Sequence, residues 1–327
     1  MTNSVTLKDV AAAAGVSIAT ASYVLRGTKT LGEQVEQRVR DAARSLGYRP
    51  NHSAQSLRTG LSYSLGLLVP DLTNPFFPAL VHSLVTSARR HGYATILIDA
   101  ENDPKLERKG FELLRRYGAD GAAWIPVSAV PAKLESPHPP LVVVDRPTGH
   151  FDVAQADHAE GGRLLARHAI ELGHRRVGLL SGPQDLSSAV ERRNGFLEAA
   201  GDRIEIVWER EVSFGQELTG DIVALLRAET ASLVVCANDT VAATVVQQVR
   251  QDGKDVPEHV SVFGFDDMPW SSLLNPALTT VRQPVAEIGA HAIELLLSRM
   301  ANPSLPPRRT TVPVSLIARQ SARKRSA

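Results

Sequence analysis

The chain has 327 residues, of which 43% are hydrophobic, and its formal net charge at pH 7 is +1. This length exceeds one comfortable hydrophobic core, so two or three domains are expected. No apolar run approaches the 18 or more residues of a membrane span, which excludes a membrane-spanning protein.

The charge is unevenly distributed along the chain. Residues 1–60 hold eight Lys and Arg against four Asp and Glu, a net charge of +4, whereas the remainder is mildly acidic at −3. A basic head on an acidic body indicates a polyanionic partner for the head. A chance asymmetry of the same size is the alternative, and four charges alone do not exclude it.

The N-terminus and the cysteine content indicate the compartment. Residues 1–10 lack the charged-then-apolar pattern of a signal peptide. The single cysteine, Cys236, rules out an internal disulfide and suits a reducing environment. It stands in an apolar strand pattern, which favours a packed thiol over a nucleophile. Together these features predict a cytoplasmic protein.

Residues 1–50 show three short amphipathic helical patterns. Thr6 and Ser17 can cap the first two, over residues 7–14 and 18–25. A third pattern, about residues 32–46, places its apolar side chains on one side. Two eight-residue helices separated by a tight turn at Gly15 have the spacing of a helix-turn-helix. We therefore predict a helix-turn-helix DNA-binding domain over residues 1–50.

Residues 51–61 fit a short helix that links this head to the rest of the chain. Asn51 can cap it, Ala54 and Leu57 share one face, and Gly60 can end it. A segment this short is not stable as an isolated helix, because the cost of nucleation is not recovered. It is predicted to be a conditional hinge helix, with an ordinary linker as the alternative.

From residue 62 onward, short apolar runs alternate with amphipathic ones. Continuous apolar strands between helices indicate parallel sheets covered on both faces. About ten strands predict an α/β fold with two doubly wound subdomains. Ligands in such folds bind beyond the carboxyl ends of the strands. Polar residues stand at these positions, with helix capping as the alternative role: Asp71, Asn74, Asp145, Arg146, residues 181–188, Asn238, Asp239, Asp266 and Asp267.

The sequence contains no recognisable catalytic set. The ten histidines are scattered, and neither a His-Glu-x-x-His metal motif nor a Gly-x-Ser-x-Gly elbow occurs. Asp266 and Asp267 are adjacent on one predicted loop and cannot flank a reacting bond. We predict that the protein is not an enzyme and requires no metal or cofactor.

Several motifs along the whole chain resemble one family. They are Val5-Thr-Leu-Lys-Asp-Val-Ala, Ala14-Gly-Val-Ser, Leu46-Gly-Tyr-Arg-Pro-Asn, Asp71-Leu-Thr-Asn-Pro-Phe-Phe, Ala237-Asn-Asp, Gly264-Phe-Asp-Asp and Thr279-Thr-Val-Arg-Gln-Pro. This combination resembles the lactose-repressor and galactose-repressor family. The resemblance implies a core like that of the periplasmic sugar-binding proteins over residues 62–327. Its N-subdomain would comprise about residues 62–158 and 284–311, and its C-subdomain about residues 159–283 and 312–327.

The resemblance also implies which residues contact DNA. The second helix would be the recognition helix in the major groove, and Leu57 of two partner chains would wedge into the minor groove. Tyr23 departs from the family, which usually has Arg there; a Tyr cannot make the bidentate Arg–guanine contact. The implied DNA-binding residues are Thr6, Leu7, Ser17, Ile18, Ala19, Ser22, Tyr23, Arg26, Asn51, Ala54 and Leu57.

A small-molecule effector is implied in the same way. The residues that would line its cleft are Asp71, Phe76, Phe77, Asp145, Arg192, Asn238 and Asp266. Carboxylates that accept hydroxyls, a forked Arg donor and a stacking aromatic ring suit a sugar. Family members that bind purines place a second Arg near position 186, where this chain has Leu186. The expected protein is a homodimeric repressor that binds operator DNA, and a solute-binding receptor for sugar uptake is the alternative.

Overall fold

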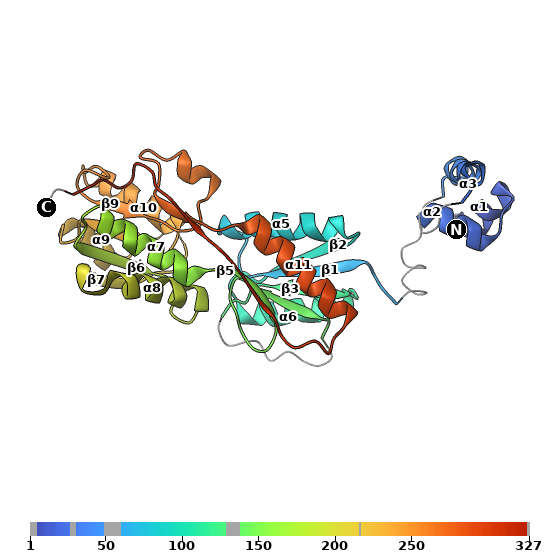
Figure 1. The fold of residues 1–327 in the computed structure, drawn as a ribbon, viewed down its shortest axis with the longest axis horizontal. Helices are drawn as coiled ribbons and strands as arrows, with labels where there is room; N and C mark the ends of the chain where they lie inside the picture. Colours follow the sequence, from blue (N-terminus) through green and yellow to red (C-terminus); the bar gives the residue numbers. More distant parts are fainter. Residues whose placement is uncertain (1–4, 27–30, 49–59, 129–137, 216, 326–327) are drawn as a thin grey trace. The chain divides into compact units, whose positions relative to one another are not determined.

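A computed structural model of the protein describes residues 5–26, 31–48, 60–128, 138–215 and 217–325. The chain forms two compact units, residues 1–62 and 63–327 (Figure 1). The predicted hinge positions Asn51, Ala54 and Leu57 lie outside the described ranges. Within those ranges, no helix combines the length and the hydropathy that crossing a membrane requires.

The first unit is a three-helix head. Its helices are α1 (Leu7–Ala14), α2 (Ile18–Arg26) and α3 (Glu33–Ser45). Thr6 and Asp9 form a capping box at the start of α1, and Gly15 ends this helix with a φ of 65°, which glycine adopts without strain. All three helices contribute to one small core of buried side chains, which includes Val10, Ala14, Ala21, Val24 and Val39. The first two helices therefore lie where the helix-turn-helix spacing predicts them.

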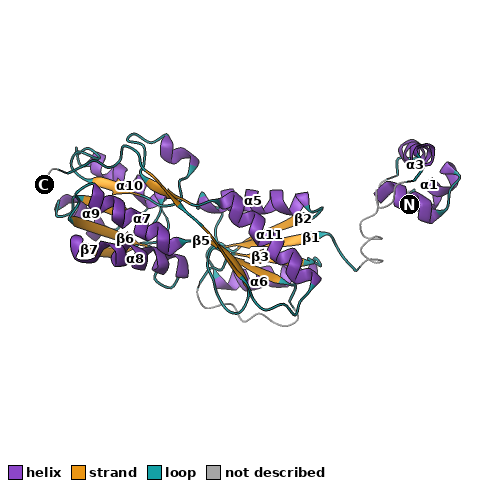
Figure 2. Ribbon diagram, in the orientation of Figure 1, coloured by secondary structure: helices purple, strands orange, loops and turns teal. Residues whose placement is uncertain are grey.

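The second unit has two α/β lobes (Figure 2). The first lobe is built on a parallel sheet with strand order β11-β5-β4-β3-β1-β2. Its strands are β1 (Ser64–Val69), β2 (Ala94–Asp99), β3 (Gly121–Trp124), β4 (Leu141–Val144), β5 (Asp152–Ala156) and β11 (Arg309–Val312). Helices α5 (Phe76–Arg90) and α11 (Val285–Ala301) cover one face of the sheet, and α6 (Pro104–Arg116) covers the other.

The second lobe is built on a parallel sheet with strand order β7-β6-β8-β9. The strands are β6 (Arg176–Ser181), β7 (Glu205–Glu211), β8 (Leu233–Cys236) and β9 (Ser261–Phe263). Helices α7 (His158–Glu171) and α8 (Ser187–Ala200) cover one face, and α9 (Gly220–Arg227) and α10 (Asp239–Gln251) cover the other. Two short 3₁₀ helices, η1 (Gly201–Arg203) and η2 (Pro269–Ser272), complete it.

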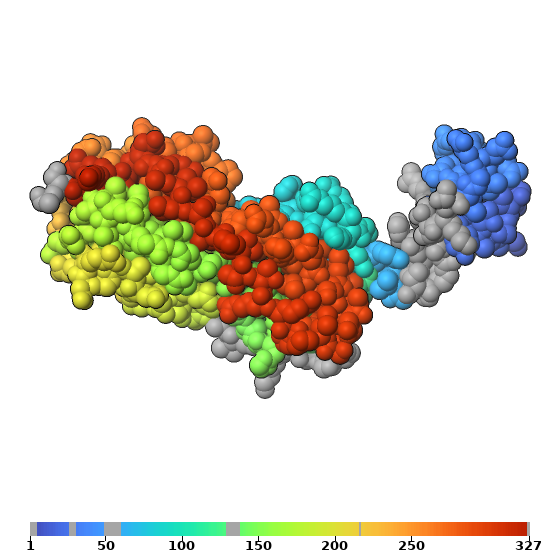
Figure 3. Space-filling model, in the orientation of Figure 1, coloured from blue at the N-terminus to red at the C-terminus, as the bar shows by residue number. Residues whose placement is uncertain are grey.

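The chain passes between the lobes three times. It leaves the first sheet after β5 and enters α7, returns from β10 (Thr280–Arg282) into α11, and leaves again from β11 into β12 (Ser315–Ile317). In Figure 3 the residues of α11 and those that follow, coloured orange to red, run over the visible face of the molecule. Because the sheets are covered on both faces, strands such as β4 and β8 are wholly buried. The doubly wound α/β fold predicted from the sequence is confirmed.

The strands β5 and β10 were not apparent in the sequence. β5 reads Asp-Val-Ala-Gln-Ala, and its two polar residues interrupt the apolar pattern. Asp152 is nevertheless buried, because Arg299 and Arg308 from the returning chain bond to its carboxylate. The other strand, β10, pairs with β12 in antiparallel fashion, in contrast to the parallel pairing of the two main sheets.

Candidate functional site

A cleft lies between the two lobes at the carboxyl ends of the strands. It encloses about 230 Å³ of space that protein atoms do not fill. Its lining residues from the first lobe are Asn74, Phe76, Phe77, Asp145 and Arg146, and those from the second lobe are Ser188, Arg192, Phe214, Asn238 and Asp266. Six of the seven residues predicted to contact an effector therefore lie together, as the strand-end rule for open α/β sheets requires.

Asp71 is the residue that the structure places outside this lining. Its Oδ1 accepts hydrogen bonds from the backbone N–H and the hydroxyl of Thr73, and its Oδ2 accepts one from Asn102. The carboxylate thus closes a turn after β1, the local role typical of Asp at such positions. Asn74, three residues further on, lines the cleft instead.

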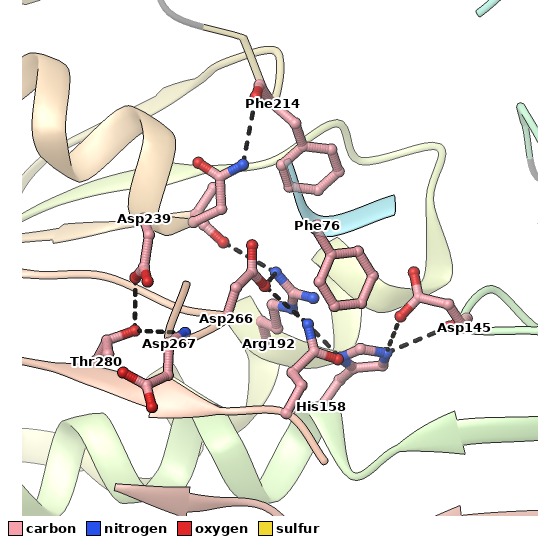
Figure 4. Close-up of polar contacts among 12 residues, drawn as sticks. Phe76, Asp145, His158, Arg192, Phe214, Asp239, Asp266, Asp267 and Thr280 are labelled. Atoms are coloured by element: carbon pink, nitrogen blue, oxygen red, sulfur yellow. Dashed lines mark hydrogen bonds and ion pairs between the residues drawn. The ribbon is translucent and has the colours of Figure 1, made fainter. Parts of the chain in front are cut away.

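Aromatic rings form the apolar surfaces of the cleft (Figure 4). Phe76 and Phe77, at the start of α5, pack edge to face with ring centroids 5.4 Å apart. Phe214 follows β7 in the opposite lobe. The guanidinium of Arg146 lies between the lobes' rings, with Cζ 5.1 Å from the centroid of Phe77 and 5.8 Å from that of Phe214. These faces can hold the apolar side of a flat ligand.

Arg192, on α8, contacts several groups around the cleft. Its Nη1 donates to the backbone oxygen of Ala237 (3.0 Å) and lies 3.5 Å from Oδ1 of Asp266. Its Nε donates to Nδ1 of His158 (3.3 Å), and its guanidinium lies over the ring of Phe265. The side chain is therefore oriented before any ligand arrives, which lowers the entropic cost of binding.

The two carboxyl groups of the cleft differ in protonation. Although burial acts to raise it, the pKa of Asp145 falls to about 2, because His158, Arg146 and Arg192 favour the ionised form. Burial raises the pKa of Asp266 to about 8, despite the opposing charge of Arg192. At neutral pH the cleft therefore presents one carboxylate, Asp145, and one carboxyl group that is largely protonated, Asp266.

The backbone at both acids is strained. Asp145 has a φ of 66° and Asp266 a φ of 116°, values that side-chain-bearing residues rarely adopt. Such strain is typical of functional sites, where the surrounding structure must enforce it. For Asp266 the enforcement comes partly from Asp239 at the start of α10. Its carboxylate accepts hydrogen bonds from Thr280 (2.5 Å), Ser271 (2.5 Å) and the backbone N–H of Met268 (2.9 Å), which tie down the loop that carries Asp266.

Three buried polar atoms near the cleft lack a hydrogen-bond partner among the described residues. They are Oδ1 of Asp145, Nε of Arg146 and Oε1 of Gln283, whose Nε2 donates to Asp266 (2.7 Å). Leaving such atoms unpaired costs free energy unless a ligand or water satisfies them. The arginine nitrogen is a donor and the two oxygens are acceptors, and the hydroxyl groups of a ligand can pair with both kinds.

Sequence reasoning missed Phe214, His158 and Gln283. Phe214 follows β7 at a strand's carboxyl end, so the same strand-end rule could have found it. His158 and Gln283 lie at crossings between the lobes, at the start of α7 and just after β10. No local sequence pattern marks a crossing, so these two required the tertiary structure.

The predicted DNA-reading residues of the head lie on α2, directly before α2, and at the start of α1. Ile18 is 50% exposed and Tyr23 43% exposed on α2, and Ala19 beside them is also exposed, whereas Ser22 is buried. Ser17 caps α2 through the backbone N–H of Thr20. At α1, Thr6 is an exposed cap and Leu7 packs partly against the core. The side chain of Arg26 lies outside the described part of the head.

Comparison with known proteins identifies the family. Residues 6–51 match the model of bacterial regulatory proteins of the lacI family, and residues 166–322 match a periplasmic binding protein-like domain. The ribose operon repressor of Bacillus subtilis is 34% identical over 98% of this chain and 99% of its own length. The chain belongs to the LacI family of bacterial regulatory proteins.

Another curated relative and two solved structures are also similar to the chain. The transcriptional repressor PurR of Haemophilus influenzae is 31% identical to this LacI-family chain, over 91% of each chain. The structure of the Lac repressor dimer bound to operator and an anti-inducer superposes with a TM-score of 0.82 at 24% identity, covering 98% of this chain and all of that one. A LacI-family regulator from Enterococcus faecium with bound ribose gives a TM-score of 0.70 at 28% identity, covering 80% of this chain and all of that one.

Proposed function

We propose that the protein is a homodimeric transcriptional repressor whose affinity for operator DNA is controlled by a neutral sugar bound in the cleft. The observation that carries the effector class is a cleft with aromatic rings in which Asp145 Oδ1 and Arg146 Nε have no hydrogen-bond partner among the described residues. The same is true of Oε1 of Gln283, whose amide bonds to Asp266. D-ribose is the first candidate, because one relative is named a ribose operon repressor and another was solved with ribose bound. Relatives named as repressors also favour regulation over catalysis.

The existing contacts in the cleft favour a neutral ligand. Two acidic residues, Asp145 and Asp266, face Arg146 and Arg192, and Asp266 is largely protonated at neutral pH because burial raises its pKa to about 8. The arginines are already engaged by these carboxyl groups, by ring faces and by backbone oxygens. A phosphate group would have to displace these contacts before either arginine could bind it. Hydroxyl groups, in contrast, donate to the acids and accept from the arginines.

The position of the cleft supports control of DNA binding. A ligand there contacts both lobes at once, so it binds one relative arrangement of the lobes better than another. Only this difference in affinity can shift the balance between arrangements. The chain leaves the first lobe at Ser64 toward the predicted hinge of residues 51–61. A change in the lobes of two partner chains would alter the spacing of their hinges, with the sugar acting as inducer or as corepressor.

The proposal assigns a separate role to each part of the chain. Residues 1–50 read the operator and residues 51–61 form the hinge, with Leu57 as the minor-groove wedge. Residues 62–327 bind the effector and form the dimer. On the recognition helix Ile18, Ala19 and Tyr23 contact bases or phosphates, and Thr6, Leu7, Ser17 and Ser22 position the helix on the duplex. Such a protein works in the cytoplasm, where its operator is.

Calorimetry and gel shift together test the proposal. The full chain is titrated with D-ribose, with ribose 5-phosphate as the charged counterpart and with guanine as a purine. We expect saturable binding of D-ribose and at least tenfold weaker binding of the other two. Palindromic fragments from upstream of its own and neighbouring genes are then tested for a salt-dependent shift that D-ribose changes.

The two measurements separate the alternatives. Sugar binding without a DNA shift would point to a solute-binding receptor. A DNA shift that D-ribose, other pentoses and hexoses all leave unchanged would overturn the effector class and keep the regulator.

A further inference from the structure

His158 is a buried histidine at the first crossing between the lobes. It is the first residue of α7 and follows the first crossing between the lobes directly after Asp157. Its side chain is completely buried, and its ring lies 6.2 Å from that of Phe265. Figure 4 shows the imidazole between Asp145 and Arg192, with contacts to both. His158 does not itself line the cleft, whereas both of these partners do.

The partners determine where the imidazole carries its proton. Nε of Arg192 donates to Nδ1 at 3.3 Å, and because a guanidinium has no acceptor, Nδ1 must present its lone pair. The hydrogen then sits on Nε2, which lies 3.2 Å from the backbone oxygen of Asp145 and 3.1 Å from its Oδ1. A neutral imidazole with this tautomer satisfies both neighbours at once. The opposite tautomer would place two hydrogens between Nδ1 and Arg192.

This bridge joins the two lobes through the residues that face the ligand. Asp145 follows β4 of the first lobe, and Arg192 projects from α8 of the second. We propose that His158 is a positioning residue that holds Asp145 and Arg192 in register across the cleft and so couples ligand contact to the arrangement of the lobes. The proposal rests on the proposed function, because it assigns a role toward that site's ligand.

A purely structural role for His158 makes different predictions. A buried imidazole that only fills space against Phe265 could be replaced by another ring of similar shape without loss of ligand affinity. A positioning residue could not, because its two hydrogen bonds would be missing. His158→Phe therefore keeps the ring and removes both bonds. His158→Asn keeps an acceptor near Nδ1 for Arg192, and His158→Gln keeps a donor near Nε2 for Asp145.

The first measurement needs no ligand. Long-range ¹H–¹⁵N NMR of the full chain with labelled histidine reports the tautomer of each imidazole, and His158→Gln assigns the signal. We expect His158 to be neutral with its proton on Nε2. A proton on Nδ1, or on both nitrogens at neutral pH, would overturn the bridge.

The second measurement uses D-ribose as the probe, by calorimetry and by its effect on the operator shift. We expect His158→Phe to weaken D-ribose binding roughly 30-fold or more and to abolish its effect on the shift. His158→Asn and His158→Gln, which each keep one bond and lose the other, should each bind D-ribose roughly three- to tenfold more weakly than the wild type. The control is His174→Gln, at a second fully buried histidine, bonded to Ser232 (2.9 Å), which should lower thermal stability but keep D-ribose affinity.

The outcomes are separable. Wild-type affinity in a folded His158→Phe variant would refute the positioning role. If His158→Phe does not fold, the affinities of His158→Asn and His158→Gln for D-ribose are the test. Wild-type affinity in both of these variants would refute the positioning role. If the wild-type protein binds no D-ribose, the proposed effector is wrong, and the tautomer measurement alone decides the bridge.

Discussion

The guanidinium of Arg192 stacks on the ring of Phe265, with Cζ 3.9 Å from the ring centroid. The two residues come from α8 and from the segment that follows β9, so the second lobe assembles this pair before any ligand is present. A cation held over an aromatic face keeps its donors directed along the plane of the guanidinium. One of these donors, Nη1, lies 3.5 Å from Oδ1 of Asp266, and both residues line the cleft. Preorganisation of this kind is a source of affinity, and it also makes Arg192 a sensitive position.

Replacing Arg192 should remove most effector binding. Arg192→Ala deletes a charged donor, removes the ion pair to Asp266 and removes the hydrogen bond to the backbone oxygen of Ala237. We expect roughly 10- to 100-fold weaker D-ribose binding by calorimetry. Its neighbour provides the control, because Arg193 pairs with Glu209 outside the cleft lining. Arg193→Ala should keep wild-type affinity, and similar losses in both variants would contradict a specific role for Arg192.

Asp266 should make the stability of the ligand-free protein depend on pH. Burial raises its pKa from 3.8 to about 8, so the folded state keeps a proton that the unfolded chain releases. The contribution of this group to the free energy of unfolding is therefore full below about pH 4 and declines as the pH rises to about 8. Denaturant unfolding at several pH values should show a shallower decline in Asp266→Asn than in the wild type. Parallel curves for the two proteins would show that Asp266 ionises normally.

A methyl group added to a glycine at the contact between α7 and α8 should disrupt the close packing of these helices. A Cβ on Gly195 would lie 2.0 Å from the backbone oxygen of Ala159, and one on Gly162 would lie 2.1 Å from that of Arg192. Because this contact brings His158 and Arg192 together, Gly195→Ala should lower the unfolding free energy by about 1–3 kcal/mol and weaken sugar binding. Gly220→Ala at the start of α9, where a Cβ meets open space, is the matched control. Equal stability of the two variants would mean that the helices can separate without cost.

Replacing Tyr23 by Arg should change the base preference of the recognition helix. This side chain is 43% exposed on α2, and a Tyr cannot form the bidentate contact that Arg makes with guanine. Selection of half-sites from a random library should show that Tyr23→Arg gains a guanine preference at one position, worth about 1–3 kcal/mol. Ser45→Arg, at an exposed position on α3, adds the same charge and should raise affinity for all sequences alike. The same guanine preference in Tyr23→Arg and in Ser45→Arg would show that residue 23 does not contact the bases.

Much of the architecture followed from local patterns. Capping residues such as Thr6 and Asn238, and a positive-φ glycine at position 15, mark helix ends through contacts within a few residues. Buried strands read as apolar runs because helices cover both faces of each sheet. The strand-end rule and the family motifs predict one cleft for six residues that line it in the structure: Phe76, Phe77, Asp145, Arg192, Asn238 and Asp266.

Other features depended on contacts between distant parts of the chain. β5 was hidden because Asp152 is buried only by virtue of arginines about 150 residues later in the chain. Asp71 was predicted to contact the effector, but its carboxylate accepts hydrogen bonds from Thr73 and Asn102. His158 and Gln283 stand at crossings between lobes, where hydrogen bonding and burial are set by which segments meet in space. The sequence alone determined the fold class, the family and most of the cleft, since these rest on periodicity and motif. Only the tertiary structure decided the protonation, the strain and the bridge across the cleft, because desolvation and hydrogen-bond geometry are properties of the assembled lobes.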